Sequence, residues 1–277
     1  KGEVVRVLED NKTLQDDINS LHIKAPEFFS FTTAEGVALN GYMIKPYDFD
    51  PSKKYPVIMR VYGGPGSQEA KQWYDGFKMM WHQMMAQKGY ITVCVDNRGT
   101  ALRGRDFRTS TYGQLGKYET NDQIEAAKWL SKQSFIDGNR IGIWGWSYGG
   151  YMAGLCITRG ADVFKAAVSV APVTNWKYYD NIYTERYMGT LETNPNGFDA
   201  NAPMAYADKL QGKYLLIHGT GDDNVHFQNS AEWINALIKN NKQFDLMIYP
   251  DRNHGVSGGN TRYHLYTLMT NFWLENL

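Results

Sequence analysis

The sequence predicts an α/β fold in which a mostly parallel, doubly wound sheet is flanked by helices. Two short apolar, β-branched runs at residues 57–62 and 91–95 are typical of central parallel strands, which are buried on both faces. From Ser147 onward, strand-like and helix-like segments alternate at short spacing, which indicates parallel strands joined by helical crossovers. The length of 277 residues is ordinary for one domain built on such a sheet.

The remaining elements follow from local patterns. Residues 27–46 predict a hairpin that turns at Glu35-Gly36, and the run at 164–170 is taken as a strand although it would suit a helix equally well. Further strands are predicted at residues 140–144, 214–218 and 244–249, and helices at residues 77–87, 121–133, 151–157 and 228–240.

Residues 145–149 read Gly-Trp-Ser-Tyr-Gly and fit the pattern Gly-x-Ser-x-Gly. They lie between a predicted strand and a predicted helix, which is the setting that a nucleophile elbow requires. The glycines let strand and helix approach closely, because a Cβ there would clash. We therefore interpret Ser147 as the nucleophile of an α/β-hydrolase fold. The alternative is a structural turn, since Gly and Ser are common in turns.

A serine hydroxyl needs a base to remove its proton and a carboxylate to orient that base. On this fold the chain order is serine, acid, histidine. Asp222 and Asp223 follow one predicted strand, and His254 follows the next. Both loops belong to the edge of the sheet at which open α/β sheets bind ligands. The sequence thus predicts a triad of Ser147, His254 and one of the two aspartates.

The other histidines fit the role of base less well. His22 lies in the N-terminal segment, His82 in a Met-rich helical stretch, and His264 in the last predicted helix. His218 closes a strand, where a structural hydrogen bond is the expected role. His226 lies close to the acidic loop and stays as the alternative base.

Composition argues against several classes of function. The chain carries 29 basic and 29 acidic side chains, so no large net field favours nucleic acid or an anionic membrane. No apolar run reaches 18 residues, so no membrane-spanning segment is predicted. No cluster has the spacing of metal ligands, and no cofactor is implied. Cys94 and Cys156 are expected to be buried free thiols.

The motifs resemble those of the prolyl oligopeptidase family of serine peptidases, in particular its dipeptidyl peptidase IV branch. The resemblance runs along the whole chain and is most specific in three segments. These are Gly-Trp-Ser-Tyr-Gly-Gly-Tyr at 145–151, Trp-Lys-Tyr-Tyr-Asp-Asn-Ile-Tyr-Thr-Glu-Arg-Tyr-Met at 176–188, and His-Gly-Thr-Gly-Asp-Asp-Asn-Val-His-Phe-Gln at 218–228.

The resemblance implies that Asp222 is the acid and Asp223 a loop carboxylate. It also implies that residues 1–24 are a linker from an N-terminal β-propeller missing from this chain, and that residues 25–277 are the α/β-hydrolase catalytic domain. Because the sequence has neither an initiator methionine nor a signal peptide, we expect a fragment of a longer protein.

Acyl transfer develops an oxyanion that needs hydrogen-bond donors. One donor is the backbone N–H of Tyr148, the residue after the nucleophile. The second must come from the loop after an early strand. In the resembling family the phenol of the tyrosine matching Tyr62 donates, whereas the alternative is that Tyr62 is an ordinary aromatic at a strand end.

The resemblance further implies a compact hydrophobic pocket that suits proline, whose rigid ring stacks on aromatic faces, and that accepts alanine less well. On a helix, Tyr179 and Tyr183 would share one face. Asn224 is implied to bond the carbonyl of the substrate residue before proline, although it could instead only shape its loop. The implied pocket residues are Tyr148, Val173, Trp176, Tyr179, Tyr183 and Val225.

Together these features predict a serine peptidase that forms an acyl-enzyme and releases N-terminal dipeptides after proline, and less well alanine, at the second position. A prolyl endopeptidase, an acylaminoacyl peptidase and a carboxylesterase-like hydrolase are alternatives from the same class of chemistry, and a catalytically silent interaction domain is the alternative from another. The expected partner is a peptide with proline at its second position, not nucleic acid. The resemblance also implies a homodimer of the full-length protein in a periplasmic or secreted location.

Overall fold

The structure, a computed structural model, describes residues 2–73 and 75–277; Lys1, where the predicted linker begins, and Tyr74 lie outside the described residues. The strands are β1 (Glu27–Thr32), β2 (Ala38–Ile44), β3 (Tyr55–Val61), β4 (Ile91–Asp96), β5 (Ile136–Trp146), β6 (Ala166–Val170), β7 (Lys213–Gly219) and β8 (Asp245–Tyr249). The helices are α1 (Lys12–Ser20), α2 (Gly76–Gln87), α3 (Arg105–Thr109), α4 (Lys117–Leu130), α5 (Tyr148–Arg159), α6 (Asn181–Met188), α7 (Gly197–Ala200), α8 (Gln228–Lys239) and α9 (Thr261–Asn276), with 3₁₀ turns η1 (Trp176–Tyr178) and η2 (Pro203–Lys209).

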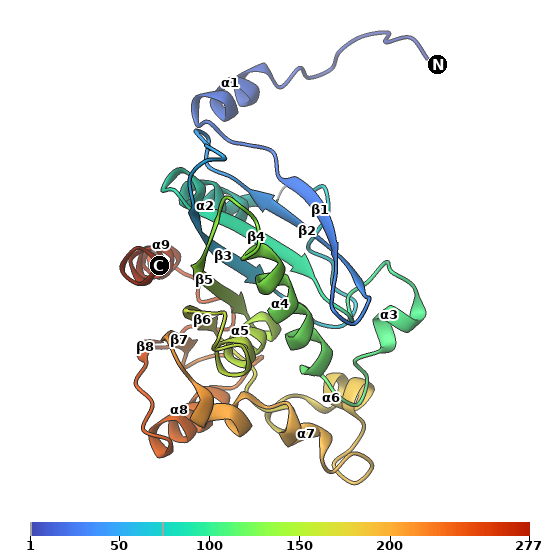
Figure 1. The fold of residues 1–277 in the computed structure, drawn as a ribbon, viewed down its shortest axis with the longest axis vertical. Helices are drawn as coiled ribbons and strands as arrows, with labels where there is room; N and C mark the ends of the chain where they lie inside the picture. Colours follow the sequence, from blue (N-terminus) through green and yellow to red (C-terminus); the bar gives the residue numbers. More distant parts are fainter. Residues whose placement is uncertain (1, 74) are drawn as a thin grey trace.

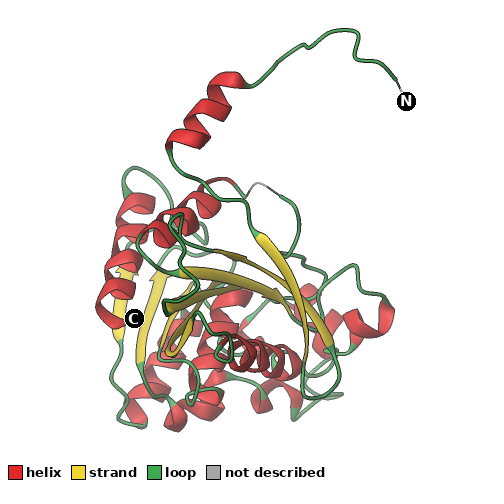
Figure 2. Ribbon diagram, turned by 45° about the horizontal axis from the view of Figure 1, so that its top comes forward, coloured by secondary structure: helices red, strands yellow, loops and turns green. Residues whose placement is uncertain are grey.

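All eight strands form one twisted sheet in the order β1-β2-β4-β3-β5-β6-β7-β8, with helices on both sides (Figures 1 and 2). β2 pairs antiparallel with both β1 and β4, and every other neighbouring pair is parallel. The predicted α/β-hydrolase fold, with its mostly parallel doubly wound sheet, is confirmed. Within the described residues, no helix combines the length and apolar character needed to cross a membrane.

The alternating side chains of the central strands divide the core into two layers. On β3, Val57 and Met59 belong to the layer that contains side chains of α4, α5 and α8, whereas Ile58 belongs to the layer that contains side chains of α2 and α9. Because both faces are covered, the central strands are rigid supports, and the loops at their carboxyl ends emerge from fixed positions. Cys94 and Cys156 are buried free thiols, as predicted.

The predicted elements are confirmed, but several boundaries differ. Helix α4 begins four residues before its predicted start, because Gly116 adopts the left-handed φ of 87° and lets the chain enter the helix there. Strand β6 begins only at Ala166, since Phe164 still closes the turn after α5 through a hydrogen bond from its N–H to the Gly160 carbonyl. Residues 1–24, for which the sequence predicts no element, contain α1, which lies away from the sheet (Figure 1).

Candidate active site

Ser147 occupies the turn between β5 and α5, at the carboxyl edge of the sheet. Its φ of 62° is positive, which is uncommon for a residue other than glycine. A Cβ on Gly145 would overlap the backbone of Gly149, and one on Gly149 would overlap the carbonyl of Val61. This close packing lets α5 begin directly at Tyr148, three residues before its predicted start. The segment therefore has the geometry of a nucleophile elbow.

Asp222 lies buried in the loop after β7, and both of its carboxylate oxygens are used. Oδ2 is 2.8 Å from His254 Nδ1 and 3.1 Å from His218 Nε2. Oδ1 accepts from the backbone N–H groups of Asn224 (3.0 Å) and Val225 (2.9 Å). Burial alone would raise the pKa of Asp222, but the hydrogen bonds from the two histidines outweigh it and hold the pKa well below its usual range. Asp222 is therefore ionised and fixed in place.

His218 orients this carboxylate. Its Nε2 lies 2.9 Å from the Val225 carbonyl, which can only accept, so Nε2 carries a hydrogen and donates to Asp222 as well. Its Nδ1 lies 2.7 Å from Ser230 Oγ. The structural hydrogen bond predicted for His218 is thus present, and the sequence alone did not reveal that its partner is the candidate acid. Asp223, by contrast, is exposed.

His254 lies in the loop after β8 with its side chain 23% exposed. Because Nδ1 faces Asp222, Nε2 lies on the opposite side of the ring. The indole Nε1 of Trp146 donates to the His254 carbonyl at 2.9 Å, so the end of strand β5 holds the histidine loop next to the elbow. Among the described residues no hydrogen bond joins Ser147 Oγ to the imidazole. Such bonds often close only when substrate binds.

Tyr62 directly follows β3 and comes close to the elbow. Its ring centroid lies 6.0 Å from that of Tyr148, and Gly64 fits between them, since a Cβ there would lie 2.9 Å from Tyr62 Cε1 and 3.0 Å from Tyr148 Cγ. Burial raises the pKa of the Tyr62 phenol, so its O–H keeps its proton at neutral pH. The Tyr148 N–H belongs to the first turn of α5, where N–H groups lack intrahelical partners. The Tyr62 side chain therefore lies beside the side chain of the residue that follows Ser147.

Four of the predicted pocket residues form an aromatic cluster. The Trp176 ring centroid lies 5.2 Å from Tyr148, 5.6 Å from Tyr179 and 5.5 Å from Tyr183. Tyr179 and Tyr183 do not share one helix: Tyr179 follows η1, and Asp180 caps the start of α6 by accepting from the Tyr183 N–H at 2.8 Å. Their rings still meet, at 5.4 Å, because the bend between the two helices brings them together.

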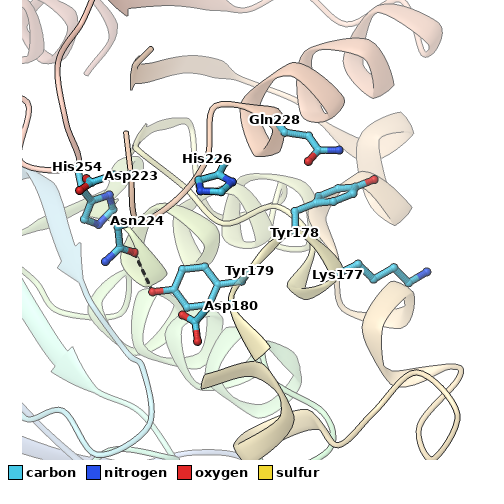
Figure 3. Close-up of a pocket in the computed structure, with 9 residues that line it drawn as sticks. All are labelled: Lys177, Tyr178, Tyr179, Asp180, Asp223, Asn224, His226, Gln228 and His254. Carbon is cyan, nitrogen blue, oxygen red and sulfur yellow. Dashed lines mark hydrogen bonds between the residues drawn. The ribbon is translucent and has the colours of Figure 1, made fainter. Parts of the chain in front are cut away.

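Asn224 is held by this cluster. The Tyr179 hydroxyl donates to Asn224 Oδ1 at 2.8 Å (Figure 3), which leaves the amide N–H₂ of Asn224 to donate elsewhere. Val173 and Val225 are fully buried in the same hydrophobic core cluster as Tyr148.

A cavity of about 610 Å³ opens beside His254, and a second of about 370 Å³ includes Trp176 and Tyr179. Within the described part of the chain, the predicted pocket residues Tyr148, Val173, Tyr183 and Val225 line neither cavity. The lining of the first is largely polar and, apart from His254, comes from the segments 176–188 and 218–228, but sequence reasoning named only Tyr179 and Asn224 of these residues as substrate-binding. Its lining residues (Figure 3) are Lys177, Tyr178, Tyr179, Asp180, Asp223, Asn224, His226, Gln228 and His254.

The fold and the elbow define an α/β-hydrolase domain. The chain belongs to the prolyl oligopeptidase family, whose profile matches residues 76–277, and the family predicted from the sequence is thereby confirmed.

The similarity extends over almost the whole chain. The chain is 43% identical over 272 residues to prolyl endopeptidase FAP of Mus musculus, and this match covers 97% of the chain and 35% of that relative. It is 41% identical over 274 residues to dipeptidyl peptidase 4 of Felis catus, and this match covers 98% of the chain and 35% of that relative. The solved structure of Porphyromonas gingivalis dipeptidyl peptidase 4 matches with a TM-score of 0.93 and 44% identity over 99% of this chain and 38% of that one. The chain thus spans about a third of the length of the curated relatives it matches.

Proposed function

We propose that residues 25–277 are the catalytic domain of a serine peptidase that releases N-terminal dipeptides by cleaving after proline, and less well after alanine, at the second position. The observation that carries this proposal is the Asp222–His254 pair, which Trp146 connects to the end of strand β5, directly before Ser147. In this proposal residues 1–24 lead from a β-propeller, and the full-length protein is a homodimer outside the cytoplasm.

In the proposed reaction, His254 Nε2 takes the proton of Ser147 as Oγ attacks the substrate carbonyl carbon. Asp222 keeps the imidazole oriented through Nδ1 and stabilises the imidazolium that forms. The oxyanion accepts hydrogen bonds from the Tyr148 N–H and the Tyr62 hydroxyl. His254 then gives its proton to the leaving amine, and water hydrolyses the acyl-enzyme with His254 again acting as base.

The aromatic cluster supports the proposed preference for proline. The ring of Tyr179, which lines the cavity beside His254, would offer an apolar face to a flat, rigid pyrrolidine, which loses little conformational entropy on binding. Trp176 and Tyr183 pack against this ring and would hold it in place. The smaller alanine side chain would fill the same site incompletely. The free amide N–H₂ of Asn224 would donate to the carbonyl of the substrate residue before proline, because Tyr179 already occupies its oxygen.

Prolyl endopeptidase activity is the second candidate, because relatives at 43–44% identity carry that name. Both activities would use the same triad and the same proline pocket. The two activities differ in whether the substrate must have a free amino terminus. The relatives extend well beyond this chain, and we expect that additional part to decide the requirement.

The test uses the full-length protein with a chromogenic Gly-Pro amide and its N-acylated form. We expect rapid release from the free amide, slower release from Gly-Ala amide and little from the blocked substrate. Ser147→Ala should abolish turnover and retain affinity for a proline-type product. Equal cleavage of the blocked substrate would establish the endopeptidase instead. Cleavage of short-chain esters alone, or no labelling by an organophosphonate, would refute both candidates.

A further inference from the structure

A buried hydrogen bond joins helix α4 to the residue that follows Ser147. Glu119, in the first turn of α4, is 0% exposed, and its Oε1 accepts from the Tyr148 hydroxyl at 2.7 Å. Tyr148 is itself buried and is the first residue of α5. The contact therefore connects the start of one helix to the start of the helix that carries the elbow.

Packing alone does not explain a glutamate at this position. Its second oxygen, Oε2, is buried and has no hydrogen-bond partner in the described part of the chain. A buried carboxyl group with an unused oxygen is less favourable than an apolar side chain of the same size. What the carboxyl group supplies, and leucine or methionine would not, is an acceptor for the Tyr148 hydroxyl.

Tyr148 lies where the proposed oxyanion site and the proposed proline pocket meet. Its backbone N–H is one proposed oxyanion donor, and its ring contacts both Tyr62, the other proposed donor, and Trp176 of the pocket. Gly64 confines the ring near its Cγ. Glu119 holds the opposite end of the side chain, the hydroxyl, so the ring is fixed at both ends.

We propose that Glu119 is a positioning residue: by holding the Tyr148 hydroxyl, it fixes the ring and the first turn of α5 relative to Ser147, and thereby sets both the rate of acyl transfer and the fit of proline. This role rests on the proposed function. Glu119 has no exposed surface and acts through Tyr148 rather than on the substrate.

The protonation state of Glu119 affects the strength of this contact. Burial raises its pKa to about 7, although the nearby backbone N–H groups and the hydrogen bond from Tyr148 oppose the increase. Either state leaves an oxygen that accepts from Tyr148, but the ionised carboxylate is the stronger acceptor. The titratable and charged groups around it are Asp122, which is paired with Arg98, and Tyr148, Tyr151, Arg159 and Tyr183. Positioning should therefore strengthen as pH rises through about 7.

The experiment compares variants of the full-length protein. Glu119→Leu removes the acceptor at similar volume, Glu119→Gln retains an acceptor oxygen, and Tyr148→Phe removes the donor but keeps the ring and the backbone N–H. Glu275→Gln, on the exposed side of α9, is the matched control for the change of a helical carboxylate. Each variant is assayed for kcat and KM on Gly-Pro amide and for the rate at which an organophosphonate labels Ser147, after thermal unfolding has shown that it is folded.

We expect Glu119→Leu and Tyr148→Phe each to lower kcat/KM about tenfold or more, which is the range for a lost hydrogen bond to a charged group. Glu119→Gln should stay within about threefold of the wild type near neutral pH, and the Leu/Phe double variant should be no worse than the poorer single variant, because both remove one interaction. The labelling rate should fall in parallel, and the ratio of the wild-type rate to the Glu119→Gln rate should rise between pH 6 and pH 8.

Three results would overturn the role of Glu119. They are a folded Glu119→Leu protein that labels at the wild-type rate, equal losses in the Gln and Leu variants, and multiplicative losses in the double variant. If Glu119→Leu does not fold, Tyr148→Phe still tests the contact from its other side. If the wild-type protein does not cleave Gly-Pro amide, the proposed function fails, but labelling of Ser147 still measures positioning without reference to peptide specificity.

Discussion

Replacing Asp222 by asparagine tests the proposed triad most directly. The substitution keeps the size of the side chain but puts an N–H₂ group in place of one oxygen. Oδ1 can still accept from its two backbone N–H groups, so the amide must face the two histidines. The Nε2–H of His218 is fixed by the Val225 carbonyl and cannot turn into an acceptor without losing that bond. Because the amide N–H₂ would donate to His254 Nδ1, the single ring proton of His254 must lie on Nε2. Nε2 then cannot accept the proton of Ser147.

The expected loss in kcat is about 10⁴, the effect of the wrong histidine tautomer in a serine triad, or about 5 kcal/mol in activation free energy. The N–H₂ group that Asp222→Asn introduces would also oppose the Nε2–H of His218, which should lower the free energy of unfolding by about 1–3 kcal/mol. Steady-state kinetics on Gly-Pro amide and urea unfolding measure the two effects separately.

Asp223→Asn is the matched control, because the neighbouring aspartate is exposed and the carboxylate that His254 contacts through Nδ1 is that of Asp222. It should keep kcat within about threefold of the wild type. Asp222→Asn activity within tenfold of the wild type, or an equal loss in Asp223→Asn, would refute the assignment of Asp222 as the acid.

Two further predictions concern Tyr62 and Glu119. Tyr62→Phe should lower kcat about 10²- to 10³-fold with little change in KM, because it removes a proposed donor that acts on the oxyanion; a larger effect on KM than on kcat would contradict that role. Glu119→Gln should become progressively more stable than the wild type as pH rises. Burial raises the folded-state pKa of Glu119 from 4.5 to about 7. The contribution of its protonated form to the free energy of unfolding is therefore fully present below pH 4.5 and is lost as pH rises through 7. The loss amounts to about 3 kcal/mol. Calorimetry of both proteins at pH 5 and pH 8 checks this, and an unchanged difference in Tm would contradict it.

The sheet could be predicted because its central strands are short, apolar and β-branched, and because turn residues separate them. The start of α4 could not, because the buried side of that helix is largely polar: Glu119, Thr120, Asp122 and Gln123 are all 0% exposed. A hydrophobic pattern does not detect a helix whose inward face makes hydrogen bonds.

The sequence was sufficient to predict which loops form the candidate site, but not the side-chain contacts within it. Ser147, Asp222 and His254 follow strands whose carboxyl ends share one edge, so order and position suffice to place all three at that edge. The contacts that orient them come from residues that lie inside the motifs but whose roles the motifs do not reveal: His218 binds the acid, and Trp146 binds the histidine loop through a carbonyl. Such bonds depend on side-chain direction in three dimensions, which one sequence does not specify. The bend between Tyr179 and Tyr183 was missed for the same reason.

Because of its positive φ, Ser147 is a residue at which the stability of the fold and the activity of the enzyme have opposite requirements. A non-glycine residue in so sparsely populated a region of φ/ψ space costs about 1–3 kcal/mol, and glycine would relieve that strain. Glycine, however, has no hydroxyl. Selection for a more stable fold and selection for a working enzyme therefore favour different residues at position 147, and the serine persists only if function outweighs the strain.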